Sequence, residues 1–290
     1  MIPSSFDYTA PSSLDEALKL LQDLGDDAKI LAGGHSLIPM MKLRFAEPEH
    51  LVDLNNVPEL SYLKIEGGLL KIGAMTREVE TEESIDVAKH FPIFADVAKL
   101  IADPQVRNFG TLGGNLAHGD AANDQPAVML ALNASVEIAG LSGRRTVGID
   151  DFFYGFYATA VQEGEILTEI SIPIPVGRSG NAYHKVERKV GDYATGGVAA
   201  HLEIDEQGIC TKAGIGLTNV NPTPLRAVRS EAALVGTPLN KEDIESAAQY
   251  ASEDCNPSSD LRGDIDYKRH IIKAITKKMI NKAKQRAFNN

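Results

Sequence analysis

The sequence predicts an α+β fold made of three consecutive segments, residues 1–55, 56–176 and 177–290. Three observations lead to this prediction. Strand and helix patterns alternate in the first segment, strand patterns flank a glycine-rich stretch in the second, and in the third the strand patterns come first and the helix patterns follow. Residues 177–180 (GRSG) are expected to be a linker before the third segment.

The first segment is expected to form a small α/β lobe. A helix over 13–24 begins at one of two consecutive serines, which are favoured cap residues. A short strand over 29–32 follows and leads into two glycines. A second helix then starts at Leu37, and a second strand spans 51–54. The lobe therefore has a glycine-rich turn between a strand and a helix.

The second segment is expected to begin with a β-hairpin. Its strands cover 60–65 and 69–72, and the Gly67-Gly68 pair forms the turn because hairpin turns need backbone conformations that glycine adopts readily. The remaining expected elements are a helical stretch that ends near Ala102, a helix over 126–132, several strands and a last strand over 166–174.

The third segment is expected to be an α+β domain in which helices cover one side of a sheet. Its expected strands cover 182–189, 197–204 and 209–217, and its expected helices cover 231–235, 241–253 and 266–287.

Composition narrows the class of protein. Hydrophobic residues make up 43% and charged residues 24%, as in a soluble globular protein, and no apolar run approaches the length of a membrane span. Residues 1–5 do not resemble the start of a signal peptide, so we expect a cytoplasmic protein without membrane insertion. The net charge of −11 argues against a general nucleic-acid binder. Only Cys210 and Cys255 are present, too few to hold an iron–sulfur cluster.

The C-terminal end has the opposite charge to the rest of the chain. Residues 267–290 contain eight Lys or Arg and no Asp or Glu, with isoleucines and a methionine at helical spacing. One interpretation is a helix with a basic, solvated face. The alternative is a docking surface for an acidic partner.

Two glycine-rich stretches are candidate binding loops. They are residues 32–37 (AGGHSL) and residues 111–116 (TLGGNL), and each leads into an apolar helix. Consecutive glycines expose backbone N–H groups, and hydroxyl or amide side chains add donors, so the pair could hold a diphosphate without a lysine. The alternative is that each stretch is only a tight turn.

Several other residues near these loops have two interpretations each. Asp124 could accept hydrogen bonds from a ribose, or Asp124 or Asn123 could cap the helix that starts at Pro126. His35 lacks catalytic or metal-binding partners at suitable spacing, which favours a hydrogen-bonding loop residue. The stretch 185–197 (KVERKVGDYATGG) could be an ordinary charged turn, or it could cover a planar cofactor with Tyr193.

These stretches together resemble a known family. The motifs LAGGHSLIPMMKLR, IADPQVRNFGTLGGN, GDAANDQPAVML and KVGDYAT are similar to those of the FAD-binding medium subunits of the molybdenum hydroxylase (xanthine dehydrogenase) superfamily, and within it to the medium subunit of aerobic carbon monoxide dehydrogenase. The resemblance extends over essentially the whole chain. It implies a two-lobed FAD-binding domain of the vanillyl-alcohol-oxidase (PCMH) type, followed by a C-terminal α+β domain.

The resemblance also implies a set of cofactor-binding residues. Residues 32–37 and 111–115 would hold the FAD diphosphate, and Asp124 would contact the ribose. Ile101 and Ala102 would line the path of the cofactor, and Leu167, Lys185, Asp192 and Tyr193 would lie near the isoalloxazine. The implied residues are Ala32, Gly33, Gly34, His35, Ser36, Leu37, Ile101, Ala102, Thr111, Gly113, Gly114, Asn115, Asp124, Leu167, Lys185, Asp192 and Tyr193. No catalytic residue and no metal ligand is implied on this chain.

By resemblance, the protein is an electron-transfer subunit. A large subunit with a molybdenum cofactor would oxidise the substrate, and a small subunit with two [2Fe–2S] clusters would pass electrons to the FAD of this chain and then to a quinone or another acceptor. A dimer of heterotrimers is implied, with peripheral membrane association left open. The alternatives are the same subunit of an aldehyde, purine or N-heterocycle hydroxylase, a stand-alone FAD oxidase, or a non-enzymatic protein that binds another phosphate ligand.

Overall fold

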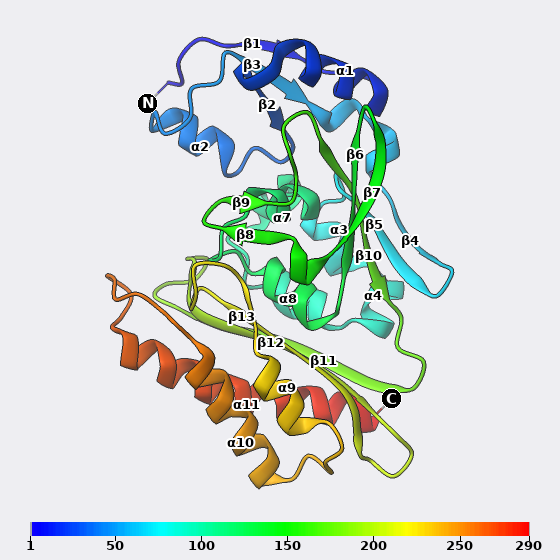
Figure 1. The fold of residues 1–290 in the computed structure, drawn as a ribbon, viewed down its shortest axis with the longest axis vertical. Helices are drawn as coiled ribbons and strands as arrows, with labels where there is room; N and C mark the ends of the chain where they lie inside the picture. The colour runs from blue at the N-terminus through cyan, green and yellow to red at the C-terminus, as the bar shows by residue number, and fades with distance from the viewer. Residues whose placement is uncertain (1, 290) are drawn as a thin grey trace.

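The computed structural model describes residues 2–289 and consists of three layers, each built on its own β-sheet (Figure 1). The N-terminal lobe lies at the top of the view, the second segment in the middle, and the C-terminal sheet and helices at the bottom (Figure 1). Of the residues described, none belongs to a helix long and apolar enough to cross a membrane.

The first lobe is a three-stranded parallel sheet with one long helix against it. The strand order is β1-β3-β2. Leu51 and Val52 of the central strand are buried, and Val52 shares a hydrophobic core with the apolar face of α1. The elements are β1 (Asp7–Thr9), α1 (Leu14–Leu24), β2 (Ala28–Leu31), α2 (Leu37–Lys42) and β3 (His50–Asp53). The predicted helices and strands are confirmed, and β1 is an additional strand that the sequence pattern did not indicate.

The second segment contains a five-stranded antiparallel sheet in the order β4-β5-β10-β6-β7. The predicted hairpin is confirmed, with φ of 61° at Gly67 and 77° at Gly68, as a tight two-residue turn requires. Its first strand is shorter than predicted because Pro58–Leu60 forms a 3-10 turn. The strands are β4 (Leu63–Glu66), β5 (Leu69–Gly73), β6 (Ser135–Gly140), β7 (Gly143–Gly148) and β10 (Ile166–Pro173), with a separate hairpin of β8 (Phe153–Gly155) and β9 (Ala158–Thr159).

The helical stretch predicted to end near Ala102 is several short helices rather than one. The hydroxyl of Ser84 accepts a hydrogen bond from the N–H of Val87 and starts a new helix, and Pro92 lacks the N–H that would continue it. The helices of this segment are α3 (Glu78–Glu83), α4 (Ile85–His90), α5 (Ile93–Ala98), α6 (Pro104–Phe109), α7 (Leu112–His118) and α8 (Gln125–Ala131). The last of these confirms the helix predicted over 126–132.

The third segment is an antiparallel sheet in the order β11-β12-β13-β14, followed by three helices. The predicted strands and helices are confirmed. The predicted linker over 177–180 is wrong, because β11 already begins at Arg178. Ser179 is buried, and Gly180 packs so tightly that a Cβ there would overlap with the carbonyl of Ala283. The elements are β11 (Arg178–Glu187), β12 (Ala194–Ile204), β13 (Cys210–Thr218), β14 (Leu225–Arg226), α9 (Val228–Leu234), α10 (Lys241–Asp254) and α11 (Ile265–Asn289).

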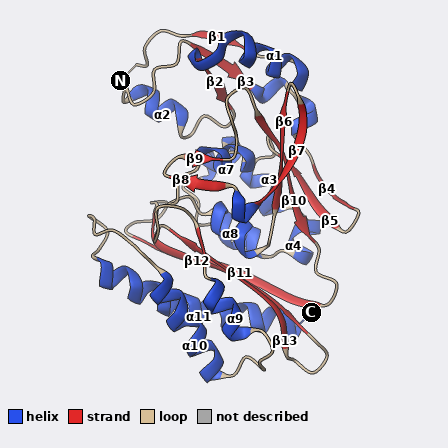
Figure 2. Cartoon of the chain, viewed as in Figure 1, coloured by secondary structure: helices blue, strands red, loops and turns tan. Residues whose placement is uncertain are grey.

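The C-terminal sheet is covered on both faces, not on one as predicted. Its own helices lie on one side (Figure 2), and α8 and α5 of the second segment contact the strands β11, β12 and β13 from the other. A Cβ at Gly214 or Gly216 would overlap with carbonyl groups of α8. Tyr183 and Ala199 of this sheet belong to the hydrophobic core of the second segment. The last two segments therefore share one core.

The C-terminal helix α11 forms as predicted, but much of its basic side contacts other parts of the chain instead of facing solvent. The buried Lys268 donates to Asp260, and Lys282 and Arg286 both pair with Asp96 of α5. The further pairs are Lys273 and Lys277 with Glu245. Docking of an acidic partner on this helix stays a prediction.

Candidate cofactor site

A cavity of about 930 Å³ lies between the layers and takes its walls from all three segments. Its volume is near the upper end of the range of small-molecule sites, roughly 300–1,000 Å³. Every residue that the sequence predicted for the cofactor lines this cavity: Ala32, Gly33, Gly34, His35, Ser36, Leu37, Ile101, Ala102, Thr111, Gly113, Gly114, Asn115, Asp124, Leu167, Lys185, Asp192 and Tyr193. The structure thus brings together residues that are up to 161 positions apart, from 32 to 193. That they bind a cofactor stays a prediction.

The first glycine loop joins the end of β2 to the start of α2. A Cβ at Gly33 would overlap with the carbonyl of Phe109 and would lie 2.8 Å from the Cα of Gly110. The close neighbour that requires a glycine here is therefore the protein's own backbone, at the entrance to the second loop. His35 donates from Nδ1 to the carbonyl of Gly33, 2.7 Å away, and its ring stacks on Phe109. His35 is thus a hydrogen-bonding loop residue, as its isolation in the sequence indicated.

The second glycine loop begins α7 and faces the first. The hydroxyl of Thr111 accepts a hydrogen bond from the N–H of Gly114 at 3.2 Å and caps the helix. A Cβ at Gly113 would lie 2.5 Å from the Cβ of Ala74, and one at Gly114 would lie 3.3 Å from the Cβ of Ala32. Gly113 is therefore constrained by Ala74, which lies outside both loops, and Gly114 is the residue that brings the second loop close to the first.

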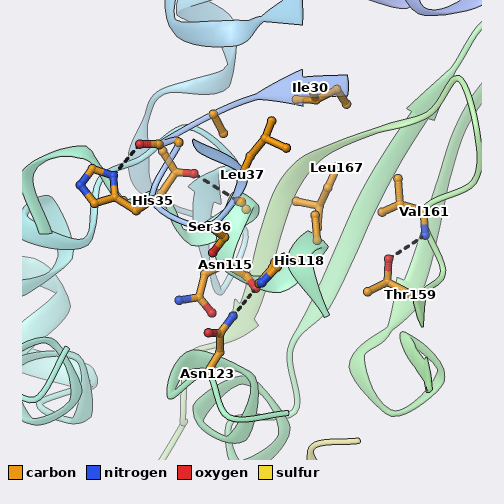
Figure 3. A pocket seen from close by; sticks show the side chains of 18 of the residues that line it. Ile30, His35, Ser36, Leu37, Asn115, His118, Asn123, Thr159, Val161 and Leu167 are labelled. Carbon is orange, nitrogen blue, oxygen red and sulfur yellow. Dashed lines mark hydrogen bonds between the residues drawn. The ribbon is translucent and has the colours of Figure 1, made fainter. Parts of the chain in front are cut away.

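Asn115 follows these glycines and lines the cavity. Its Oδ1 is buried and has no hydrogen-bond partner among the described residues. An unsatisfied buried acceptor is costly, and a donor group on a bound ligand would satisfy it. Figure 3 shows Ser36, Asn115 and Asn123 turned toward the same space, with Leu37 and Leu167 along its wall. Two glycine loops with an unsatisfied amide between them fit a large polar ligand.

Asp124 is the centre of a buried hydrogen-bond network that crosses to the third segment. Lys185 donates from Nζ to Asp124 Oδ2 at 2.8 Å, and the hydroxyl of Tyr183 donates to Oδ1 at 2.6 Å. Burial raises the pKa of the Asp124 carboxyl, and the charge of Lys185 opposes this rise. The alternative that Asp124 caps the helix is wrong, because its side chain makes no cap hydrogen bond and points to the sheet instead.

The loop between β11 and β12 carries the last predicted residues to the cavity. Lys185 donates to the carbonyl of Asp192 at 2.9 Å, and the Asp192 carboxylate pairs with Arg262 at 3.1 Å. Burial alone would raise the pKa of Asp192, but the hydrogen bonds from Arg262 and from the N–H of Tyr193, together with the charges of Arg262 and Arg188, keep that pKa below its usual value. This anchoring leaves Tyr193 at the edge of the cavity with 45% of its surface exposed.

Glu78 is a cavity residue that sequence reasoning missed. It begins α3, is 1% exposed, and accepts a hydrogen bond from Nε2 of Gln125 at 2.6 Å. Burial raises the pKa of Glu78 to about 7. Tyr183 is a second missed residue, since it orients Asp124 without lining the cavity. Neither has a local sequence signal, because each depends on contacts between residues about 50 positions apart.

Comparison with known proteins gives matches over nearly the whole chain. Residues 4–175 match the family described as FAD binding domain in molybdopterin dehydrogenase, and residues 181–283 match the CO dehydrogenase flavoprotein C-terminal domain. The carbon monoxide dehydrogenase medium chain of Afipia carboxidovorans is 46% identical over 289 residues, which is 100% of each chain.

Two solved structures are also similar. A carbon monoxide dehydrogenase of Hydrogenophaga pseudoflava, which lacks the Mo-pyranopterin moiety of its molybdenum cofactor, has a TM-score of 0.96 and 50% identity over 99% of each chain. Quinoline 2-oxidoreductase of Pseudomonas putida 86 has a TM-score of 0.92 and 39% identity, again over 99% of each chain.

Proposed function

The chain belongs to the family of FAD-binding domains of molybdopterin dehydrogenases, and from this premise we propose that it is the FAD-carrying medium subunit of a carbon monoxide dehydrogenase. The observation that carries the proposal is the single cavity lined by both glycine loops and by Asp124, Lys185 and Tyr193. The similarity to carbon monoxide dehydrogenases supports the choice of substrate, since it covers the full length of the chain.

Each part of the cavity has a role in this proposal. The backbone N–H groups of residues 32–37 and 111–115 would hold the diphosphate of FAD. Asp124 would accept hydrogen bonds from the ribose. Lys185 and Asp192 would hold the polar edge of the isoalloxazine, and Tyr193 would cover one of its faces. Ile101, Ala102 and Leu167 would exclude water along the path. When bound, FAD supplies the capacity to accept electrons and pass them on.

The proposal assigns the other cofactors to other chains. A large subunit would hold the molybdenum cofactor and oxidise carbon monoxide, and a small subunit would hold two [2Fe–2S] clusters that relay electrons to this chain. Two such heterotrimers would form the complete enzyme, with a quinone or another acceptor taking the electrons. This chain would contribute no acid or base to the oxidation of the substrate, and its residues would only bind and orient the flavin.

A second candidate is the same subunit of an enzyme that hydroxylates an N-heterocycle. The similarity to quinoline 2-oxidoreductase, at 39% identity, supports this alternative. The two candidates share the cavity of this chain, because the substrate would bind to the large subunit. They therefore differ in the substrate that reduces the flavin.

The test is the visible spectrum of the natively purified complex, recorded without oxygen before and after adding carbon monoxide. We expect a flavin band with iron–sulfur shoulders that bleaches with carbon monoxide. Bleaching by quinoline but not by carbon monoxide would favour the second candidate. A complex without any flavin would contradict both.

A further inference from the structure

Glu78 occupies an unusual position beside the second glycine loop. Its backbone N–H donates to the carbonyl of Gly110 at 3.0 Å, and Oε1 of its side chain accepts a long hydrogen bond, 3.5 Å, from Nδ2 of Asn115. Oε2 accepts from Gln125. The carboxyl is thus enclosed by the loop that is expected to hold the diphosphate.

Within residues 2–289, no cation forms an ion pair with the carboxyl of Glu78. The charge of Arg107 acts on this carboxyl, but that guanidinium is paired with Glu82 at 2.9 Å. Asp124 adds negative charge from the start of α8, although Lys185 neutralises part of it. Both hydrogen-bond partners of Glu78 are neutral amides. A buried carboxylate without a counter-ion is costly, so proton binding there is favoured.

We propose that Glu78 binds a proton when the diphosphate of FAD enters the cavity, so that flavin binding and proton uptake are linked. The inference rests on the proposed function. A diphosphate adds negative charge beside a carboxyl that already lacks a cation, and the neutral acid removes the repulsion. The amide of Gln125 can present either its NH₂ group or its carbonyl oxygen, so the hydrogen bond persists in both protonation states.

The direction of the pH effect follows from linkage. Burial already raises the pKa of Glu78 in the flavin-free protein to about 7, and the diphosphate would raise it further. The complex therefore holds more protons than the free protein above neutral pH. As a result, the Kd for FAD should rise with pH in that range, by up to about tenfold per pH unit for a single proton.

The experiment uses the assembled enzyme after removal of its flavin. It is titrated with FAD from about pH 6 to about pH 9, and flavin fluorescence gives the Kd. Glu78→Gln mimics the protonated acid, and Glu83→Gln is the matched control because Glu83 is exposed on the same helix. Proton uptake is measured in parallel with an indicator dye in weakly buffered solution.

We expect wild type and Glu83→Gln to lose affinity as the pH rises, whereas Glu78→Gln should keep its low-pH affinity and take up no proton. Any pH dependence of the Kd that remains in Glu78→Gln comes from other cavity groups, such as His118.

The inference would be overturned, without affecting the proposed function, if the Kd of wild type and of Glu78→Gln depended on pH in the same way, or if the variant bound no FAD at any pH. If the variant does not assemble into the complex, the wild type alone tests the inference. A Kd for FAD that does not change with pH, together with no proton uptake on binding, would overturn it. A wild-type complex that binds no FAD would overturn the proposed function as well.

Discussion

The ion pair between Lys185 and Asp124 is a buried contact at the cavity, and its atoms are 2.8 Å apart. Replacing Lys185 with Met leaves Asp124 without its cation. We expect the free energy of unfolding of the flavin-free chain to fall by about 3–5 kcal/mol, the usual result of removing one partner of a buried pair. Urea unfolding measures this change.

The exposed pair of Lys64 and Glu66 supplies the control for this measurement. Lys64→Met should leave the urea midpoint almost unchanged, because solvent screens exposed pairs. Equal effects of the two substitutions would show that Asp124 does not depend on Lys185.

Glu78 should make the stability of the flavin-free chain depend on pH. Its pKa is about 7 in the folded chain and 4.5 in the reference state, so the folded state binds more protons between these values. The stabilisation that protonated Glu78 contributes is therefore fully present below pH 4.5 and is lost as the pH rises to about 7. Between pH 5 and pH 8 the difference in free energy of unfolding should therefore shift in favour of Glu78→Gln over wild type by about 2.5 kcal/mol, measured by urea unfolding at both pH values. An equal difference between the two proteins at both pH values would contradict this.

The residues of the cavity were predictable where their signal is local. Gly33, Gly114 and Asn115 lie in short sequence motifs, and the resemblance of these motifs to those of a known family implied that they bind the same ligand. Glu78 and Tyr183 could not be predicted, because an isolated glutamate or tyrosine looks the same whether it is exposed or buried against a distant strand. The structural reason for a glycine at position 33 could not be predicted either, because the backbone that it contacts lies 76 positions away in the sequence.

Among the elements, β11 and α11 pack in very close contact. A Cβ at Gly180 would overlap with the carbonyl of Ala283. Gly180→Ala should therefore push the helix away from the sheet and lower the free energy of unfolding by roughly 1–3 kcal/mol, as overpacking does. Thermal unfolding checks this.

Gly177 is the matched control for Gly180→Ala, because it precedes the same strand and a Cβ there would lie 4.0 Å from the nearest carbonyl. Gly177→Ala should leave the melting temperature nearly unchanged. Unchanged melting of Gly180→Ala would mean that α11 can shift at little cost.

Element types were easier to predict than their boundaries and contacts. The apolar periodicity of residues 266–287 and the glycine pair at 67–68 define their elements locally. In contrast, residues 177–180 look like a linker because glycine and serine are typical of loops. The place of Gly180 in β11 depends on a helix more than 100 residues later in the chain. Tertiary packing of this kind is invisible in a local pattern.

At the scale of the whole molecule, the second and third segments share a core, because α8 packs on β13 and Tyr183 lies among the apolar residues of the second segment. A fragment of residues 178–290 would expose that face of its sheet. We expect this fragment to aggregate or to lack a cooperative thermal transition, whereas the full chain unfolds cooperatively. Calorimetry and light scattering of both proteins check this, and a soluble, cooperatively folded fragment would contradict it.

The shared cavity also sets an order of events during synthesis. Its walls come from residues near 32, near 113 and from 185 to 193, and the last group is anchored by Arg262, close to the C-terminus. A nascent chain that has emerged from the ribosome only as far as the second segment has both glycine loops but lacks the strand that carries Lys185 and Tyr193. The complete binding site therefore exists only after residue 262 has left the ribosome, so that a flavin can be held at both glycine loops and at Lys185 only from that point on.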